Sequence, residues 1–149
     1  MSGRIVQIAI AAAGGVPKRP VAEARVTAAG IDGNVVAHPR IHGGPDKALC
    51  LYSEERILAL QREGHPIRAG SAGENITIAG IDWGMLAPGM RLRLGERLRI
   101  EFTSYTTPCA TIAASFADRD PGRIGQKRHP GWSRLYARVL APGTIRTGD

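Results

Sequence analysis

Cys109 is the residue with the clearest potential for chemistry. It directly follows Pro108 and lies just beyond a segment with strong strand patterning, which predicts a loop position at a strand end. A thiol in a loop near cations has a larger thiolate fraction, and thiolate is the form that binds soft metals or carries sulfur. The alternative is an inert small hydrophobe. Cys50 lies inside the apolar run 48–52, and we expect it in the core; two cysteines do not suggest a disulfide framework.

Segment 42–47 reads HGGPDK and is a candidate ligand-binding loop. Its paired glycines, Gly43 and Gly44, allow backbone amides to approach a ligand closely, and Lys47 is a mobile charge suited to phosphate. We therefore take His42 and these three residues as candidate binding residues. The alternative is a tight turn with a solvent-exposed lysine.

Two further polar segments complete the set of candidates. Asn75, at the entrance to an expected strand, can both donate to and accept from a polar ring system, or can simply form a turn. Segment 123–138 is basic and contains Arg128, Arg134 and a tryptophan at position 132. Such a stretch can neutralise and stack on nucleic acid, or can form the wall of a phosphate pocket. The net charge of +7 suits a phosphate-bearing partner, and solubility alone would also explain it.

Short strands dominate the expected secondary structure. Alternation over 90–103 predicts a β-hairpin with a two-residue type II′ turn at Gly95-Glu96 and arginines on the solvent face. Further strands are expected over 4–12, 23–27, 48–52 and 134–139. In the last of these, we expect Leu135, Ala137 and Val139 to point inward and Arg134, Tyr136 and Arg138 outward.

One helix is expected over 54–62, with Ser53 as its N-cap, an apolar face of Ile57, Leu58 and Leu60, and Gly64 as its stop. Residues 16–20 are expected to form an exposed basic loop. Many short strands with one or two short helices predict a mainly β protein, an antiparallel sheet curled into a barrel, within a single domain over 1–149.

The apolar N-terminal run suits a buried strand better than a secretory signal, because it alternates and carries one basic residue. No stretch approaches the roughly 18 apolar residues that a membrane helix needs. We therefore expect a cytoplasmic protein that has no membrane partner.

Taken together, these segments resemble the MOSC domain, the C-terminal domain of molybdenum cofactor sulfurases, and in particular its stand-alone bacterial members. The resemblance runs from position 30 to position 149. It rests on glycines 30 and 33 and on the segments 42–48, 73–75, 108–109, 131–132, 138–140 and 148–149. Two departures are visible: Asn34 stands where many relatives carry Asp, and the neighbours of Cys109 are small or hydroxylated residues instead of basic or bulky polar ones.

The resemblance implies a β-barrel that binds a molybdenum–pyranopterin cofactor, with Cys109 as the metal ligand. It implies an oxidoreductase component that reduces N-hydroxylated compounds, with electrons from a separate donor protein, because no flavin, haem or iron–sulfur motif appears. Lys47, Arg128 and Arg134 would hold the cofactor phosphate, and Asn75 and Thr107 would bond the pterin. The pyridoxal-phosphate domain of the sulfurases is absent from this chain.

Two other interpretations stay open at this point. In the first, the protein is a cofactor carrier or sulfur-transfer module, in which Cys109 bears a persulfide supplied by a sulfur-donor protein. In the second, of a different class, it is a basic nucleic-acid-binding β-barrel, an interpretation that we do not favour. The first shares every sequence feature with the oxidoreductase, whereas the second needs no cofactor.

Overall fold

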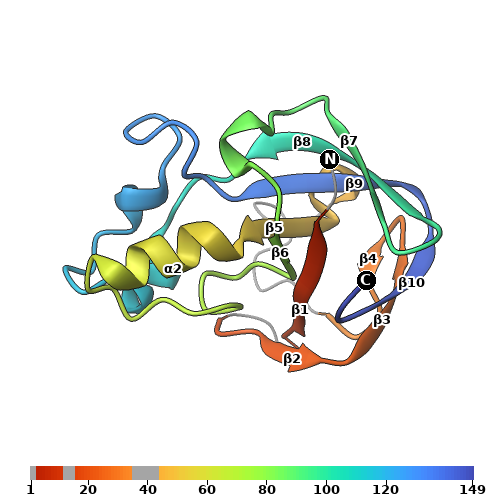
Figure 1. Ribbon diagram of the computed structural model, residues 1–149, viewed down its shortest axis with the longest axis horizontal. Coiled ribbons are helices and arrows are strands. Elements are labelled where there is room, and N and C mark those ends of the chain that lie inside the picture. Colours follow the sequence, from red (N-terminus) through yellow and green to blue (C-terminus); the bar gives the residue numbers. More distant parts are fainter. Residues whose placement is uncertain (1–2, 12–15, 35–43) are drawn as a thin grey trace.

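The computed structural model describes residues 3–11, 16–34 and 44–149. Its main sheet has seven strands in the order β2-β1-β6-β5-β9-β8-β7, and a smaller sheet has the order β10-β3-β4. The strands of the main sheet are β1 (Arg4–Ile10), β2 (Arg19–Val21), β5 (Leu49–Ser53), β6 (Ile76–Ala79), β7 (Arg91–Leu94), β8 (Leu98–Tyr105) and β9 (Leu135–Ala141). Those of the smaller sheet are β3 (Glu23–Thr27), β4 (Gly30–Ile31) and β10 (Gly143–Arg146). Figure 1 shows the smaller sheet beside β1, at the opposite end of the molecule from the helix α2.

The main sheet is mixed, which corrects the expectation of an antiparallel sheet. β5 pairs with β6 in parallel, Leu51 opposite Ile76, whereas the other pairs are antiparallel. The connection between β5 and β6 contains α2 (Glu54–Arg62), which returns the chain to the end of the sheet from which β5 started. Among the described residues β2 and β7 have neighbours on one side only, so closure into a barrel is not confirmed. The expectation of a mainly β fold is confirmed.

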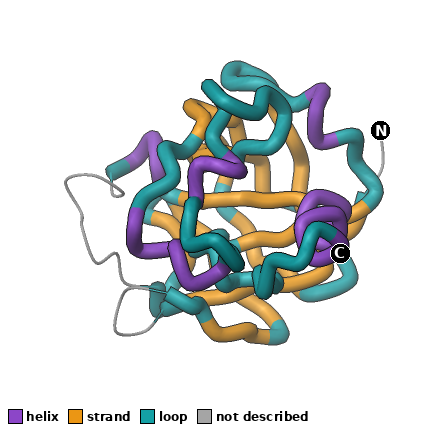
Figure 2. The backbone as a smooth tube through the Cα atoms, turned by 90° about the vertical axis from the view of Figure 1, so that its left-hand side faces the viewer, coloured by secondary structure: helices purple, strands orange, loops and turns teal. Residues whose placement is uncertain are grey.

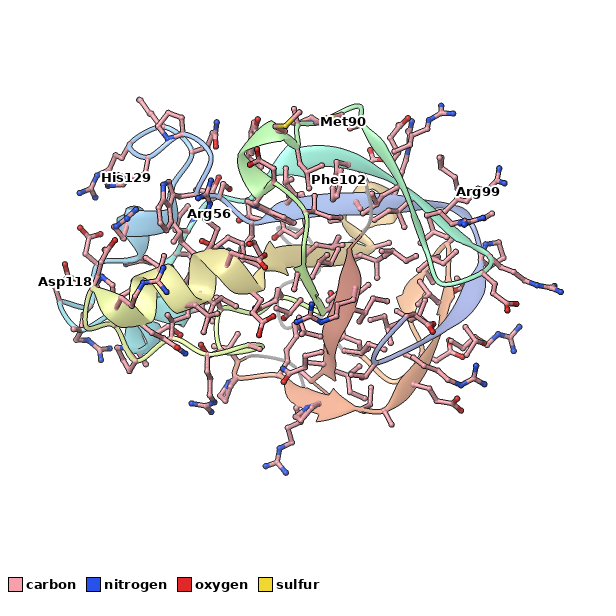
Figure 3. The ribbon with its side chains drawn as sticks, viewed as in Figure 1. Arg56, Met90, Arg99, Phe102, Asp118 and His129 are labelled. Carbon is pink, nitrogen blue, oxygen red and sulfur yellow. The ribbon has the colours of Figure 1, made fainter. Side chains whose placement is uncertain are left out.

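The β7–β8 hairpin is confirmed, but the prediction of a two-residue turn is wrong. Leu94 pairs with Leu98, so three residues, 95–97, form the turn, with Gly95 at φ +64°. A two-residue loop would have placed Leu94 opposite Arg97. The three-residue loop places Leu94 opposite Leu98 instead, so that the apolar side chains of both strands lie on the same face of the hairpin. Arg99 accordingly points to solvent and Phe102 into the core (Figure 3).

Helix α2 has the bounds that the sequence predicts. Ser53 accepts a hydrogen bond from the backbone N–H of Arg56 at 3.2 Å, which satisfies one of the free donors of the first turn. The chain leaves the helix through Gly64 at φ +99°. Ile57 and Leu60 are buried, but Leu58 is 43% exposed, which corrects its expected place on the apolar face. Four 3₁₀ segments complete the described helical structure: η1 (Pro45–Lys47), η2 (Trp83–Met85), η3 (Ala110–Ser115) and η4 (Pro121–Ile124).

Burial on β9 differs from the expected alternation. Leu135 and Ala137 are buried as expected, but Arg134 and Tyr136 are buried as well. β9 lies between β5 and β8 in the middle of the sheet (Figure 1), and helices and loops lie over the strands on the side that Figure 2 shows. The start of β9 is buried on both faces, so no side of the strand faces water there. Only Arg138 points outward as predicted.

Two expectations for the N-terminal region also differ from the structure. β1 ends at Ile10 and not at residue 12, and the expected exposed loop over 16–20 contains the start of β2 and a half-buried Lys18. None of the helices in the described ranges has the length and apolar content that crossing a bilayer requires. The assignment of residues 1–149 to a single domain stays a prediction.

Candidate functional site

Cys109 lies at the N-cap position of η3, half-buried and outside any strand, as the sequence predicts. The far end of η3 is fixed from two sides. The buried Ser115 hydroxyl lies 2.8 Å from the Ser71 hydroxyl and donates to the Ser71 carbonyl at 3.1 Å. His65 Nδ1 accepts a hydrogen bond from the Ala117 N–H at 3.1 Å. A thiol at the start of this anchored segment is therefore both accessible and held in place.

Tyr136 is the centre of a group of charged and thiol side chains. The ammonium of Lys47 lies 5.2 Å from the centroid of the Tyr136 ring, a cation–π distance. Burial raises the pKa of the Tyr136 phenol; the charges of Cys50 and Cys109 raise it further, and Arg134 opposes them. All four side chains are thus within electrostatic range of one ring, and we call these five residues the Tyr136 cluster.

Arg134 is the most unusual member of the cluster. It is 7% exposed, yet among the described residues no carboxylate lies within ion-pair distance of its guanidinium. One terminal nitrogen donates to the Ala72 carbonyl at 2.6 Å, while the buried Nε has no hydrogen-bond partner within the described ranges of the chain. Because burying a charge is costly unless it is paired, this guanidinium is suited to an anionic ligand.

Lys18 supplies a third cation, half-buried, beside the two cations of the cluster. Burial lowers its pKa, and the charges of Cys50 and Glu74 oppose that shift. Its ammonium donates to Asn34 Oδ1 at 3.2 Å, and the same oxygen accepts the Ala11 N–H at 2.9 Å. Asn34 is a neutral amide, so it positions Lys18 without neutralising it.

Glu74 is the acidic counterpart of these cations. Its carboxyl is fully buried and burial raises its pKa, against backbone hydrogen bonds from its own N–H and that of Gly70 and against the charge of Arg134. Thr77 Oγ1 donates to Oε2 at 3.4 Å, and Oε1 has no partner among the described residues. Glu74 therefore partly offsets Arg134 and Lys18 at a distance, without making an ion pair with either.

Asn75 and Cys50 are joined inside the sheet. Asn75 Oδ1 accepts the Cys50 N–H at 3.1 Å, and Nδ2 donates to the Ala9 carbonyl at 3.3 Å, so its side chain links β5 to β1. The Cys50 thiol is buried as predicted, and burial raises its pKa to about 11. The expected contact of Asn75 with a pterin stays a prediction; its observed contacts belong to the sheet.

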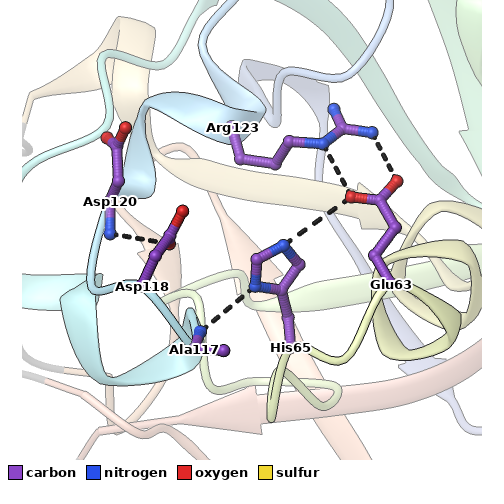
Figure 4. A network of polar contacts seen from close by, with 6 residues as sticks. All are labelled: Glu63, His65, Ala117, Asp118, Asp120 and Arg123. Atoms are coloured by element: carbon purple, nitrogen blue, oxygen red, sulfur yellow. Dashed lines mark hydrogen bonds and ion pairs between the residues drawn. The ribbon is translucent and has the colours of Figure 1, made fainter.

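The arginines of the basic segment are divided between two places. Arg123 donates twice to Glu63, at 2.9 and 2.7 Å (Figure 4), and stacks on the Trp132 ring with Arg56 as a second cation over the same ring. Arg128 is exposed and pairs with Asp120 at 3.1 Å. Among the described contacts, neither arginine reaches the Tyr136 cluster, whereas Arg134 belongs to it.

The structure thus brings three predicted site residues together, namely Lys47, Cys109 and Arg134. Gly44, exposed at φ +94°, begins η1 just before Lys47, and Thr107 is exposed two residues before Cys109. The two remaining candidates, His42 and Gly43, lie outside the described residues. The binding roles of Gly44, Asn75, Thr107 and Arg128 stay predictions.

Three residues of the site were missed by sequence reasoning. Lys18 was assigned to an exposed loop and Tyr136 to the solvent face of β9, and Glu74 was given no role in the site. For Glu74 a signal was available, because a carboxylate two residues before a short, mostly apolar strand stands out. Lys18 and Tyr136 carry no such local signal, since their burial depends on segments far away in the sequence.

Comparison with known proteins shows the family to which this chain belongs. The model of the MOSC domain matches residues 38–149, and the chain belongs to the MOSC domain family, as the sequence motifs predict. Protein YiiM of Escherichia coli (strain K12) is 33% identical over 128 residues, which cover 83% of this chain and 55% of YiiM. The uncharacterized protein YflK of Bacillus subtilis (strain 168) is 29% identical over 136 residues, which cover 90% of this chain and 60% of YflK. The chain therefore spans between half and two thirds of the length of these relatives.

Solved structures agree with this assignment. YiiM from Geobacillus stearothermophilus superposes with a TM-score of 0.73 at 27% identity, over 99% of this chain and 72% of that chain. The YuaD protein from Bacillus subtilis has the same fold, with a TM-score of 0.74 at 19% identity. The MOSC family is associated with molybdenum cofactor binding.

Proposed function

We propose that this protein binds a molybdenum–pterin cofactor at the Tyr136 cluster, with Cys109 as the metal ligand, and acts as a small oxidoreductase component on N-hydroxylated compounds. The observation that carries the proposal is the buried guanidinium of Arg134, which lacks an ion-pair partner among the described residues and lies in one cluster with an accessible thiol. Family membership supports the choice of cofactor.

The residues present fit such a group. Arg134 and Lys47, with Lys18 beside them, supply the positive charge that a cofactor phosphate requires. Two buried polar atoms, Arg134 Nε and Thr106 Oγ1, have no hydrogen-bond partner in the part of the chain that the structure describes, so a polar ligand could supply one. Cys109 offers the soft thiolate that molybdenum favours.

When bound, the cofactor would supply two-electron redox chemistry, with electrons from a separate donor protein. The chain itself would do three things. Cys109 would bind the metal from the start of η3, whose far end is anchored. The cations would hold the anionic part of the cofactor, and buried Glu74 would limit the net charge of the site when no cofactor is bound.

The experiment is metal and pterin analysis of the protein expressed in a host that makes the cofactor. We expect near-stoichiometric molybdenum and pterin in the wild type and reduction of an amidoxime by the loaded protein with a chemical electron donor. Cys109→Ser replaces a soft thiolate with a hard, largely protonated hydroxyl, so molybdenum content and activity should be lost. Arg134→Met should lower pterin content as well.

Arg99→Met is the matched control, because Arg99 is exposed on β8 and makes no ion pair among the described residues. Unchanged molybdenum and activity in Cys109→Ser would contradict the ligand role. Full cofactor loading without turnover, together with a persulfide on Cys109, would favour the carrier or sulfur-transfer alternative. Salt-sensitive oligonucleotide binding by molybdenum-free protein would favour the nucleic-acid alternative.

A further inference from the structure

A groove of about 560 Å³ lies away from the Tyr136 cluster, between the start of β1 and the edge of β7. None of the five cluster residues lines it. Its floor is apolar and includes Ile5 and Ile78, and its rim carries Arg4, Arg91 and Arg93. The groove therefore combines an apolar base with a positively charged edge.

The groove follows the free edge of β7. Every residue from 91 to 96 lines the groove. Because successive side chains of a strand point to opposite faces, lining by consecutive residues indicates that the groove runs along the edge of the strand and not over one face. Within the described part of the chain β7 pairs with β8 alone and is the last strand of its sheet (Figure 1).

The backbone groups at this edge can be assigned from the pairing with β8. The Phe102 N–H donates to the Met90 carbonyl at 2.9 Å, so the carbonyl of Met90 faces β8. Because the direction of backbone groups alternates along an antiparallel strand, those of Leu92 and Leu94 also face β8. The N–H and C=O groups of Arg91 and Arg93 therefore point to the free edge, beside the groove.

The charges of the rim decide what this edge can accept. Arg91 is 70% exposed and pairs with Glu101 on β8, and Arg93 is exposed with no ion pair among the described residues. Glu96 and Asp149 also line the groove, and Arg4 pairs with Glu54, so Arg93 is the lining arginine that has no ion pair among the described residues. In a symmetric dimer formed through this edge, the arginines of both copies would meet, so repulsion disfavours a second copy. An acidic extended segment would be attracted instead.

We propose that this groove binds an acidic, extended segment of a partner protein, which adds to the main sheet as a strand along β7. Its backbone would pair with the free groups of Arg91 and Arg93, as in other cases of strand addition to a sheet edge. Acidic side chains would lie opposite the arginines, and the alternate side chains would lie over the apolar floor. The recognised sequence is thus an alternation of acidic and apolar residues.

The test uses a fluorescein-labelled peptide, acetyl-VEVEVEV-amide, and fluorescence anisotropy with the wild-type chain. We expect saturable binding that weakens between 50 and 300 mM NaCl, because exposed charges are screened. Reversing both rim charges, R91E with R93E, should weaken binding at least about tenfold, equivalent to roughly 1.4 kcal/mol. R25E, on β3 in the smaller sheet, is the matched charge reversal and should bind like the wild type.

A second pair of variants separates backbone pairing from charge. R93P and R93A both remove the guanidinium, but only R93P removes the N–H that faces the groove; proline is tolerated at such an edge position. R93P should therefore bind several-fold more weakly than R93A, and bound peptide should protect the Arg91 and Arg93 amides of the wild type from hydrogen exchange. Equal binding of a peptide with Lys in place of Glu, no binding by the wild type, or a dimer that R93P dissociates would each overturn the proposal.

Discussion

The two cysteines should differ sharply in reactivity, because Cys50 is buried with a raised pKa, whereas Cys109 lies half-buried at the start of η3. Iodoacetamide reacts with the thiolate, and a pKa of about 11 leaves about one Cys50 side chain in a thousand ionised at pH 8. A thiol at the ordinary value of 9.0 would be about one-tenth ionised, so ionisation alone slows Cys50 by about a hundredfold. The 7% exposure of Cys50 slows it further, whereas Cys109 is half-buried at a segment end.

The assay is peptide mass spectrometry after timed alkylation of the native protein at pH 8. We expect one modification per chain, at Cys109, and modification of Cys50 only after denaturant is added. Cys109→Ser should abolish fast labelling, and Cys50→Ser should leave it unchanged. Labelling of Cys50 before Cys109 in the folded wild type would refute the reasoning, because it would require an open path to β5 that the structure does not have.

Three predictions concern stability and can be checked by denaturant unfolding. Ser53→Ala removes the N-cap of α2 and should cost about 1 kcal/mol, with no change in cofactor content. Glu74→Gln should flatten the dependence of stability on pH. Because the folded-state pKa of Glu74 is raised, the free energy of unfolding of the wild type should fall as the pH rises above the pKa of Glu74 in the unfolded chain, by at most about 1.4 kcal/mol per pH unit. The variant should not show this loss. Gly30→Ala should cost about 1–3 kcal/mol, because φ is +109° and the new Cβ would lie 2.7 Å from the Ala48 carbonyl oxygen. Gly64→Ala, with φ +99° and open space around it, should cost less.

Local structure was predictable where the determining residues are close in sequence. The bounds of α2 follow from the Ser53 cap and the Gly64 stop, and β3 has its predicted bounds, residues 23–27. The β7–β8 hairpin was predictable from its alternation, although the choice between a two-residue and a three-residue turn required the register of Leu94.

Burial within the site was not predictable, because it depends on strand order. Period-two alternation indicates an inner and an outer face only when one face meets water, and the start of β9 has both faces covered. Arg134 and Tyr136 were therefore assigned to solvent. Lys18 likewise looks like an exposed lysine until the fold places it near Glu74 and Cys50. The motif cysteine was the exception, since a proline and the end of a strand fix its position locally.

The β5–α2–β6 unit can form early in folding, because its contacts join residues that are close along the chain. Leu51 pairs with Ile76, and helix α2 takes up part of the connection between them. The Asn75 side chain also accepts a hydrogen bond from the Cys50 N–H, 25 residues earlier in the chain. By contrast, β9 can join β5 only after most of the chain has been made, and long-range pairing of this kind is slow. The cations of the site would therefore assemble in order, with Arg134 arriving last and completing the cluster at the final docking step.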